Sequence, residues 1–229
     1  PIFTACFLLF VPLAHGHPGG LDKQGGHTHR DSGEYHCHRE PCLTLHRQQQ
    51  QAEQEAREHN RAFSGLYERK DWPHWLDQDG DCQDTRAEIL IATSQVPVTF
   101  TRDDRCTVAT GRWHDPYSGN IFTSAGDLDI DHLVPLRHAH GHGGDSWDER
   151  HRRQFANDPA NLLPVSASAN RSKGASSPDQ WLPNNRGYWC QYGQHWQQIK
   201  QRYRLLITPP EQQAIDELLG TCQMAEKRP

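Results

Sequence analysis

The sequence has little hydrophobic material for its length and no excess of positive charge. Only 34% of its 229 residues are hydrophobic, the mean hydropathy is -0.91 and the formal net charge is -5. This amount of apolar material predicts a single core of roughly 150 residues and argues against a second large domain. Because contacts to phosphate groups need lysine and arginine, the negative charge argues against a generally basic nucleic-acid-binding protein.

Several common motifs are also missing. The sequence shows no internal repeat, no glycine-rich phosphate-binding loop, no nucleophile elbow of a serine hydrolase and no hydrophobic run long enough to span a bilayer. These absences argue against a repeat protein, a P-loop enzyme, an α/β-hydrolase and a membrane-spanning protein.

The longest hydrophobic stretch, residues 2–13, ends in small residues near Ala14. This pattern is typical of a signal peptide, which we expect over residues 1–16. The sequence begins at Pro1 without a basic leader, so the true start of the signal is expected to be missing. The alternative is a buried amino-terminal strand or helix. A signal peptide predicts a protein that is secreted, or that lies in the periplasm or at the cell surface of a bacterium.

Six cysteines follow the predicted signal peptide. An even number of cysteines is typical of disulfide-bonded proteins in oxidising compartments. The number alone allows many pairings. The alternative is a reduced cytosolic protein with free thiols.

Two later segments contain the residues that point to chemistry. In the first, residues 129–136, Asp131 and His132 precede Pro135, which marks the end of a strand because proline cannot donate to a sheet. An aspartate oxygen suits a hard ion such as Mg²⁺, and a neutral imidazole can take a proton from water near neutral pH. The alternative is a structural hydrogen-bonding pair at the end of a strand.

The second segment, residues 161–174, begins at Asn161 and predicts a strand over 162–165 and a helix over 166–172. Asn170 would lie on the first turns of this helix and Lys173 at its end, near any bound phosphate. The alternatives are that Asn161 is an ordinary turn residue and that residues 170–173 are only a solvated helix end.

Together the two segments resemble the ββα-metal finger (His-Me finger) of HNH endonucleases, in the variant with Asp-His, Asn and Asn. Residues 72–222 are similar to the secreted HNH family related to the C-terminal domain of GmrSD-type restriction enzymes. The matching stretches are residues 72–75, 79–86, 111–119, 155–159 and 178–183.

The resemblance implies a role for each matching residue. Asp131 and Asn170 would be the ligands of one Mg²⁺ or Mn²⁺ ion, and Asn170 stands where the family name has its final histidine. His132 would be the general base, and Asn161 would brace the finger and orient that histidine. Arg171 and Lys173 would lie near the scissile phosphate. Arg86, on a helix expected over 85–93, would either contact the nucleic acid or brace the core.

The resemblance also informs the disulfides. The order of cysteines in the family, together with their separation, favours Cys82 with Cys106 and Cys190 with Cys222. Cys37 and Cys42 are expected to close a local loop.

The segment before the nuclease-like region is rich in glycine and histidine. Residues 17–42 resemble the small YHYH module of secreted bacterial proteins, and His27, His36 and His38 are a possible Zn²⁺ site. The alternative is a disulfide-closed loop with surface histidines, since Cys37 cannot be both a ligand and a disulfide partner. Residues 43–71 predict a polar helical linker, and residues 72–229 the endonuclease domain.

A second histidine-rich stretch, residues 138–144, contains His138, His140 and His142. We expect a loop near the site here, with transition-metal binding as the alternative.

The fold class expected for the endonuclease domain is α+β, with a ββα-metal core and flanking helices. Strands are expected over 97–101, 105–112 and 127–134, and further helices over 147–155, 189–204 and 209–221. Any nucleic-acid footprint must be a local basic patch, for which the candidates are Arg150, Arg152, Arg153, Arg171, Lys173, Lys200, Arg202 and Arg204.

The sequence therefore predicts a secreted, monomeric, metal-dependent endonuclease that hydrolyses phosphodiester bonds of DNA, with RNA as a further substrate to consider. The alternative is a secreted, His-rich metal-binding or envelope-associated protein in which the finger is inactive.

Overall fold

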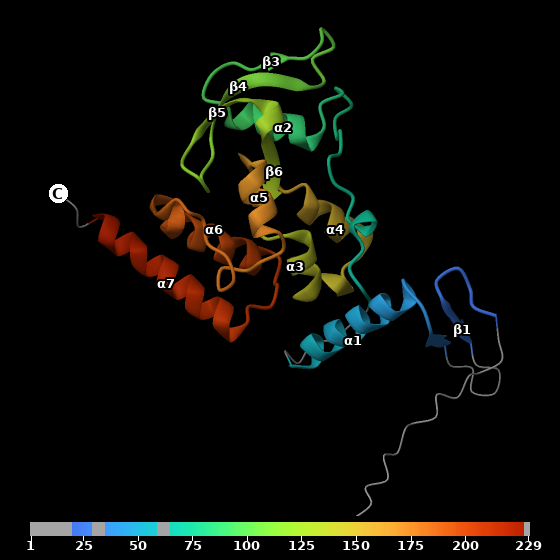
Figure 1. Ribbon diagram of the computed structural model, residues 1–229. Helices are drawn as coiled ribbons and strands as arrows, with labels where there is room; N and C mark the ends of the chain where they lie inside the picture. Colours follow the sequence, from blue (N-terminus) through green and yellow to red (C-terminus); the bar gives the residue numbers. More distant parts are fainter. Residues whose placement is uncertain (1–19, 29–34, 59–64, 227–229) are drawn as a thin grey trace, which may run out of the picture. The chain divides into compact units, whose positions relative to one another are not determined.

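The structure is a computed structural model that describes residues 20–28, 35–58 and 65–226. It divides into two compact units, Pro1–Gln51 and Ala52–Pro229, which are described separately (Figure 1). The predicted signal peptide lies outside the described residues.

The first unit contains a short antiparallel hairpin of β1 (Gly26–Thr28) and β2 (Tyr35–Cys37), in which His27 faces His36. The helix α1 (Cys42–Glu58) follows, and the Cys37–Cys42 disulfide joins its first residue to the end of β2. The helix confirms the helical character expected for the start of the linker.

The second unit is a mixture of helices and small antiparallel sheets, which confirms the predicted α+β class. One sheet has the order β3-β4-β5 and the other pairs β6 with β7. The strands are β3 (Thr99–Phe100), β4 (Val108–His114), β5 (Ile121–Ser124), β6 (Leu128–His132) and β7 (Leu162–Ser166). The α-helices are α2 (Thr85–Thr93), α3 (Leu136–Gly141), α4 (Glu149–Ala156), α5 (Ala167–Lys173), α6 (Trp189–Arg202) and α7 (Pro209–Glu226). Short 3-10 turns are η1 (Arg69–Asp71), η2 (Ala125–Asp127), η3 (Gly144–Ser146), η4 (Pro159–Asn161) and η5 (Arg186–Tyr188).

The β6–β7 pair lies between two hydrophobic cores. Leu128, Ile130 and Leu162 belong to the core that includes α2 and β4. Leu133 and Val165 belong to the larger core that includes α6 and α7. Because both cores hold this pair, the polar residues at its end have a rigid support.

The sequence also explains why β7 passes directly into α5. Ser166 is the last residue of β7 and the N-cap of α5, where its hydroxyl accepts a hydrogen bond from the backbone N–H of Ala169. Serine is a favoured N-cap because it satisfies an otherwise unpaired amide of the first turn. Asn170 and Lys173 are therefore fixed relative to the strand pair.

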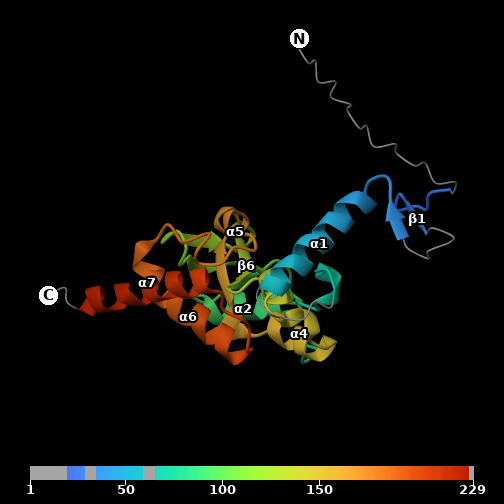
Figure 2. The same cartoon turned by 90° about the horizontal axis from the view of Figure 1, so that it is seen from below.

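Helices α6 and α7 lie side by side, as Figures 1 and 2 show. Gly193 allows this close approach, since a Cβ atom at this position would lie 2.8 Å from the Cβ of Leu218. The Cys190–Cys222 disulfide joins the same two helices. Together with Cys82–Cys106 and Cys37–Cys42, it confirms all three expected disulfides.

Removal of the Cys190–Cys222 disulfide is expected to destabilise the second unit. The two cysteines are 32 residues apart, and cross-linking a loop of this size stabilises a fold by about 3–4 kcal/mol in the chain-entropy model. Urea unfolding of the Cys190→Ser/Cys222→Ser variant, followed by tryptophan fluorescence, measures this loss. All seven tryptophans lie in the second unit, so the matched Cys37→Ser/Cys42→Ser variant should unfold at the wild-type urea concentration. Equal shifts for both variants would contradict this account.

Two elements differ from the sequence prediction. The strand β5 was not expected, and the helix α3 covers residues 138–141 of the stretch 138–144, where a loop was expected. Leu136 and Ala139 are buried one helical turn apart, and this spacing anchors α3 to the core. The alternating histidines obscured that short apolar pattern.

Candidate active site

The strand pair and the following helix bring the predicted site residues together. In the antiparallel register, Asp131 faces Leu163 and His132 faces Leu162 at the open end of β6. Helix α5 contacts both strands. β6 and α5 thus position Asp131, His132 and Asn170.

A cavity of about 310 Å³ opens at this place. It is lined by Tyr67, Arg69, Ile130, Asp131, His132, Pro135, Leu136, Arg137, Asn170, Gly174 and Ala175. Three residues predicted from the two separate sequence segments, Asp131, His132 and Asn170, therefore share one cavity.

The imidazole of His132 is held in one tautomer. Its Nε2 lies 2.8 Å from the backbone oxygen of Ala156, and because a carbonyl can only accept, Nε2 carries the hydrogen. Nδ1 then bears the lone pair. Burial lowers the pKa of His132 from its usual value to about 3, so the ring is neutral at neutral pH. A neutral ring with a defined acceptor atom is the form that a general base requires.

Asn161 clamps the chain just after His132. Its fully buried side chain accepts from the N–H of Val134 at 2.9 Å and donates to the oxygen of the same residue at 3.1 Å. Its own backbone oxygen accepts from the N–H of Leu133 at 2.8 Å. These three bonds fix the turn that ends β6.

The carboxamide of Asn170 is oriented by Asp129. Its Nδ2 donates to Asp129 Oδ2 at 3.0 Å, which fixes which end of the amide is the oxygen. Asp129 was not assigned a role from the sequence. Its position two residues before Asp131 places it on the same face of β6, and this alternation was the signal that could have revealed it.

Asp131 is enclosed by hydrogen-bond donors. Lys173 Nζ lies 3.0 Å from Oδ1 and 2.8 Å from Oδ2, and the hydroxyl of Tyr117 donates to Oδ2 at 2.7 Å. Burial raises the pKa of Asp131, while Lys173 and Tyr117 act in the opposite direction and favour the carboxylate. A carboxylate has about four lone-pair sites, so one on Oδ1 is left for another partner.

The phosphate contact predicted for Lys173 is wrong for this structure. The side chain is fully buried, and besides Asp131 it donates to the backbone oxygen of His132 at 2.8 Å. Its ammonium is thus engaged by Asp131 and by the backbone of His132 within the protein. Lys173 therefore supports the end of β6 rather than facing solvent.

Breaking this buried ion pair should lower the free energy of unfolding. Replacing Lys173 by methionine leaves the Asp131 carboxylate buried without its counter-charge, for which about 3–5 kcal/mol of stability is expected to be lost. The second change, in Lys173→Met/Asp131→Asn, removes the unpaired charge and should recover a large part of that loss. Urea unfolding of the two variants tests this. A double variant no more stable than the single one would show that the ion pair does not explain the burial of Lys173.

Tyr117 reaches Asp131 from a turn between β4 and β5. The buried carboxylate of Asp115 accepts from the N–H of Tyr117 at 2.8 Å, from the hydroxyl of Ser118 at 2.6 Å and from the N–H of Ser166 at 3.1 Å. This turn therefore links the three-stranded sheet to the start of α5. Sequence reasoning missed both residues because the contacts that join them to the site, Tyr117 with Asp131 and Asp115 with Ser166, are more than 10 positions apart.

The basic residues are arranged differently from the prediction. The half-buried guanidinium of Arg86 donates to the backbone oxygens of Ala125 and Leu128, so it braces the core and the nucleic-acid contact is wrong. Arg171 is exposed on α5. Two arginines that were not predicted, Arg69 and Arg137, are exposed and line the cavity. Arg137 follows the Asp-His segment directly, which was a usable signal.

The structure does not gather His27, His36 and His38 into a metal site. Among the described residues, only two groups of three or more metal-binding side chains converge, His138 with His142 and Glu211, and the exposed Asp77, Asp79 and Asp81. The ring centres of His27 and His36 lie 6.5 Å apart, and Cys37 is in a disulfide. The ring centres of His27 and His38 lie 4.8 Å apart, and the Zn²⁺ site of the amino-terminal module stays a prediction.

The helices of the described residues are short or polar relative to a bilayer-spanning segment. None within residues 20–28, 35–58 and 65–226 has the length and apolar character needed to cross a bilayer.

Comparison with known proteins decides the family. The model of the family "GmrSD restriction endonucleases, C-terminal domain" matches residues 84–216, which is more than half of the chain. The chain belongs to this family. The matched residues contain β6, β7 and α5 with Asp131, His132 and Asn170, and the predicted relation to GmrSD-type enzymes is confirmed.

A relative in the fungus Arthroderma benhamiae, named "Uncharacterized secreted protein", is 37% identical over 158 residues, which are 68% of this chain and 76% of the relative. No solved structure matches the chain. Membership of the GmrSD C-terminal family suggests a nuclease with a nucleic-acid substrate and, in general terms, a divalent metal. The YHYH-like module lies outside the matched residues, and a fungal relative gives no support to the expected bacterial source.

Proposed function

We propose that this member of the GmrSD C-terminal family is a metal-dependent endonuclease of the HNH type that hydrolyses phosphodiester bonds of DNA. The observation that carries the proposal is the state of His132. A neutral imidazole, with its tautomer fixed by Ala156, lines the same cavity as Asp131 and Asn170. This combination is what deprotonation of water beside a metal-held phosphodiester requires.

The residues present fit a hard divalent ion. Asp131 has one oxygen lone pair left after Lys173 and Tyr117 are counted, and the amide oxygen of Asn170 is set by Asp129. Carboxylate and carboxamide oxygens suit Mg²⁺ or Mn²⁺, which keep several waters and so need few protein ligands. When bound by these two residues, such an ion would stabilise the negative charge that develops on the phosphate oxygens.

The chain's own residues supply the rest of the mechanism. Nδ1 of His132 accepts the proton of the attacking water, and the hydrogen bond from Nε2 to Ala156 stabilises the imidazolium that forms. Asn161 holds the backbone after His132, so the ring keeps its position during this change. Arg69 and Arg137 lie at the cavity and can bind the substrate phosphates on either side of the scissile bond.

We also propose that the protein is located outside the cytoplasm. The support for this location is the three disulfides, which persist in oxidising compartments, and the secreted relative. The monomeric state stays a prediction.

Removal of divalent metal is expected to abolish cleavage. Supercoiled plasmid incubated with the purified full chain and Mg²⁺ or Mn²⁺ should be nicked, and excess chelator should stop the reaction until metal is restored. A single-stranded RNA of similar length, treated in parallel, measures the preference for DNA. Cleavage that persists in chelator would contradict the metal requirement, and absence of cleavage with either ion would favour the alternative of an inactive finger.

A further inference from the structure

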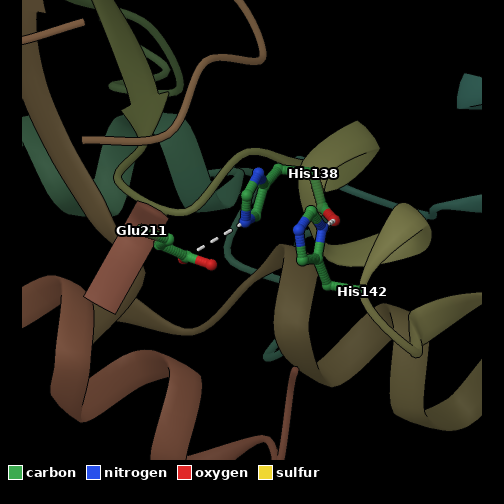
Figure 3. A group of neighbouring side chains, drawn as sticks. All are labelled: His138, His142 and Glu211. Atoms are coloured by element: carbon green, nitrogen blue, oxygen red, sulfur yellow. Dashed lines mark hydrogen bonds and ion pairs between the residues drawn. The ribbon is translucent and has the colours of Figure 1, made fainter. Parts of the chain in front are cut away.

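A second cluster of metal-binding side chains lies among the helices of the same unit. His138 is on α3, His142 caps the carboxyl end of that helix, and Glu211 is in the first turn of α7. Figure 3 shows the two imidazoles next to one another, with the carboxylate of Glu211 facing His138. None of the three lines the cavity at His132, so they are separate from the proposed nuclease site.

The three side chains converge closely enough to share an ion. One ligand atom from each lies within 4.8 Å of the others, and His138 Nε2 is 3.4 Å from Glu211 Oε1. Histidines four residues apart project from the same side of a helix, and here their rings stack at 3.8 Å. Zinc bonds of about 2.1 Å require ligand atoms roughly 3.4 Å apart, so the ligand atoms must move closer and the stacked rings must turn to aim both lone pairs at one ion.

Each imidazole has one nitrogen that can act as an acceptor. Nδ1 of His142 donates to the backbone oxygen of His138 at 2.7 Å, which leaves Nε2 as the acceptor of that ring. Nε2 of His138 accepts from the Lys200 ammonium at 2.9 Å. Two neutral imidazole nitrogens and one carboxylate form the His₂Glu ligand set that holds Zn²⁺ in several enzymes, with a fourth position left for another group.

The cluster already binds one positive charge. Lys200, on α6, is fully buried, and its Nζ lies 2.9 Å and 3.1 Å from the two carboxylate oxygens of Glu211. Its ammonium thus contacts two of the three ligand residues at once. Lys200 was a candidate for the basic patch, and its burial excludes that role. A site built around an internal cation is suited in charge to a metal ion.

We propose that His138, His142 and Glu211 form a binding site for Zn²⁺ or a similar transition-metal ion, in which Lys200 is the resident cation of the metal-free chain. Imidazole ligands favour such ions over Mg²⁺, so this site and the oxygen-lined nuclease site select different metals. An ion bound here joins α3 to the start of α7 and stabilises the packing behind the nuclease site. Access of the ion requires the Lys200 side chain to withdraw.

The Lys200→Met variant isolates the site. It removes the competing ammonium group and leaves the buried carboxylate of Glu211 without that counter-charge. Titration of the full-length variant with Co²⁺, read from its ligand-field absorption, should show binding at least about tenfold tighter than in the wild-type chain. Zn²⁺ should displace the Co²⁺ and raise the melting temperature of the variant. The added change in Lys200→Met/His142→Gln should remove both effects.

His142 provides a test that does not depend on how Lys200→Met folds. It is only partly buried at the end of α3, so His142→Gln alone is a mild change, and it should weaken Co²⁺ binding by the otherwise wild-type chain at least tenfold. The histidines of the amino-terminal module are present in every variant and cancel in the comparison. Equal Co²⁺ affinity with and without His142, in either background, would overturn the proposal, as would absence of ligand-field bands in both.

Discussion

Replacing His132 by alanine is expected to reduce Mg²⁺-dependent nicking of plasmid DNA by at least about a hundredfold, because loss of a general base typically costs 10²–10⁴ in rate. The buried ring contacts Ala156 and lies near Trp75, with ring centres 5.7 Å apart and the rings tilted by 31°. The variant therefore also needs a folding control. Its circular dichroism and its melting temperature in the absence of substrate should show that the second unit remains folded.

The matched control for this substitution is His114→Ala. His114 is exposed on β4 and does not line the cavity. Its removal should leave the nicking rate within about twofold of the wild-type rate, which is far from the loss expected for a general base. The concentration of Mg²⁺ that gives half-maximal rate should be the same for His132→Ala and the wild-type chain, since His132 is not a metal ligand in this account. A folded His132→Ala variant with wild-type activity would remove the general base from the mechanism.

Replacing Asn170 by alanine should cause a loss of similar size by a different route. Without the amide oxygen, one of two protein ligands for the metal is missing, and loss of a group that stabilises the charge developing in a transition state costs about 10²–10³ in rate. Unlike His132→Ala, this variant should also need a higher Mg²⁺ concentration for half-maximal activity. Nicking rates measured over a range of Mg²⁺ concentrations separate the two effects.

Two further variants define what the Asn170 result means. Ser168 is exposed on the same helix, and Ser168→Ala should behave like the wild-type chain. Asp129→Asn removes the acceptor that orients the Asn170 amide, for which a loss of about 10- to 100-fold is expected of an orienting residue. An Asn170→Ala variant with unchanged Mg²⁺ dependence would show that Asn170 does not hold the metal.

The sequence was most informative where local patterns carry the structure. The change from strand to helix expected at residues 165–166 lies where β7 becomes α5, and Pro135 predicted the end of β6, because an apolar run and a missing proline N–H act over a few residues. The helix expected over residues 85–93 has those same bounds in the structure. The disulfides were also correct, although the two in the nuclease domain rested on resemblance to a family.

The sequence was least informative for side chains whose partners lie far away in the chain. Lys173 looked available for a phosphate, yet it is buried against Asp131, 42 positions away. Arg86 could face either solvent or the core, and only the course of the chain from β5 to β6 placed two backbone oxygens within its reach. The convergence of Glu211 on His138 likewise depends on how α7 packs, which no local pattern encodes.

The protonation state of His132 is the property on which the proposed mechanism depends most directly. It can be measured by ¹⁵N NMR of the histidine side chains at pH 7, with His132→Gln used to assign the signal. The account predicts a neutral ring in which Nε2 is protonated and Nδ1 is not. An imidazolium at this pH, or a ring protonated at Nδ1 alone, would contradict it.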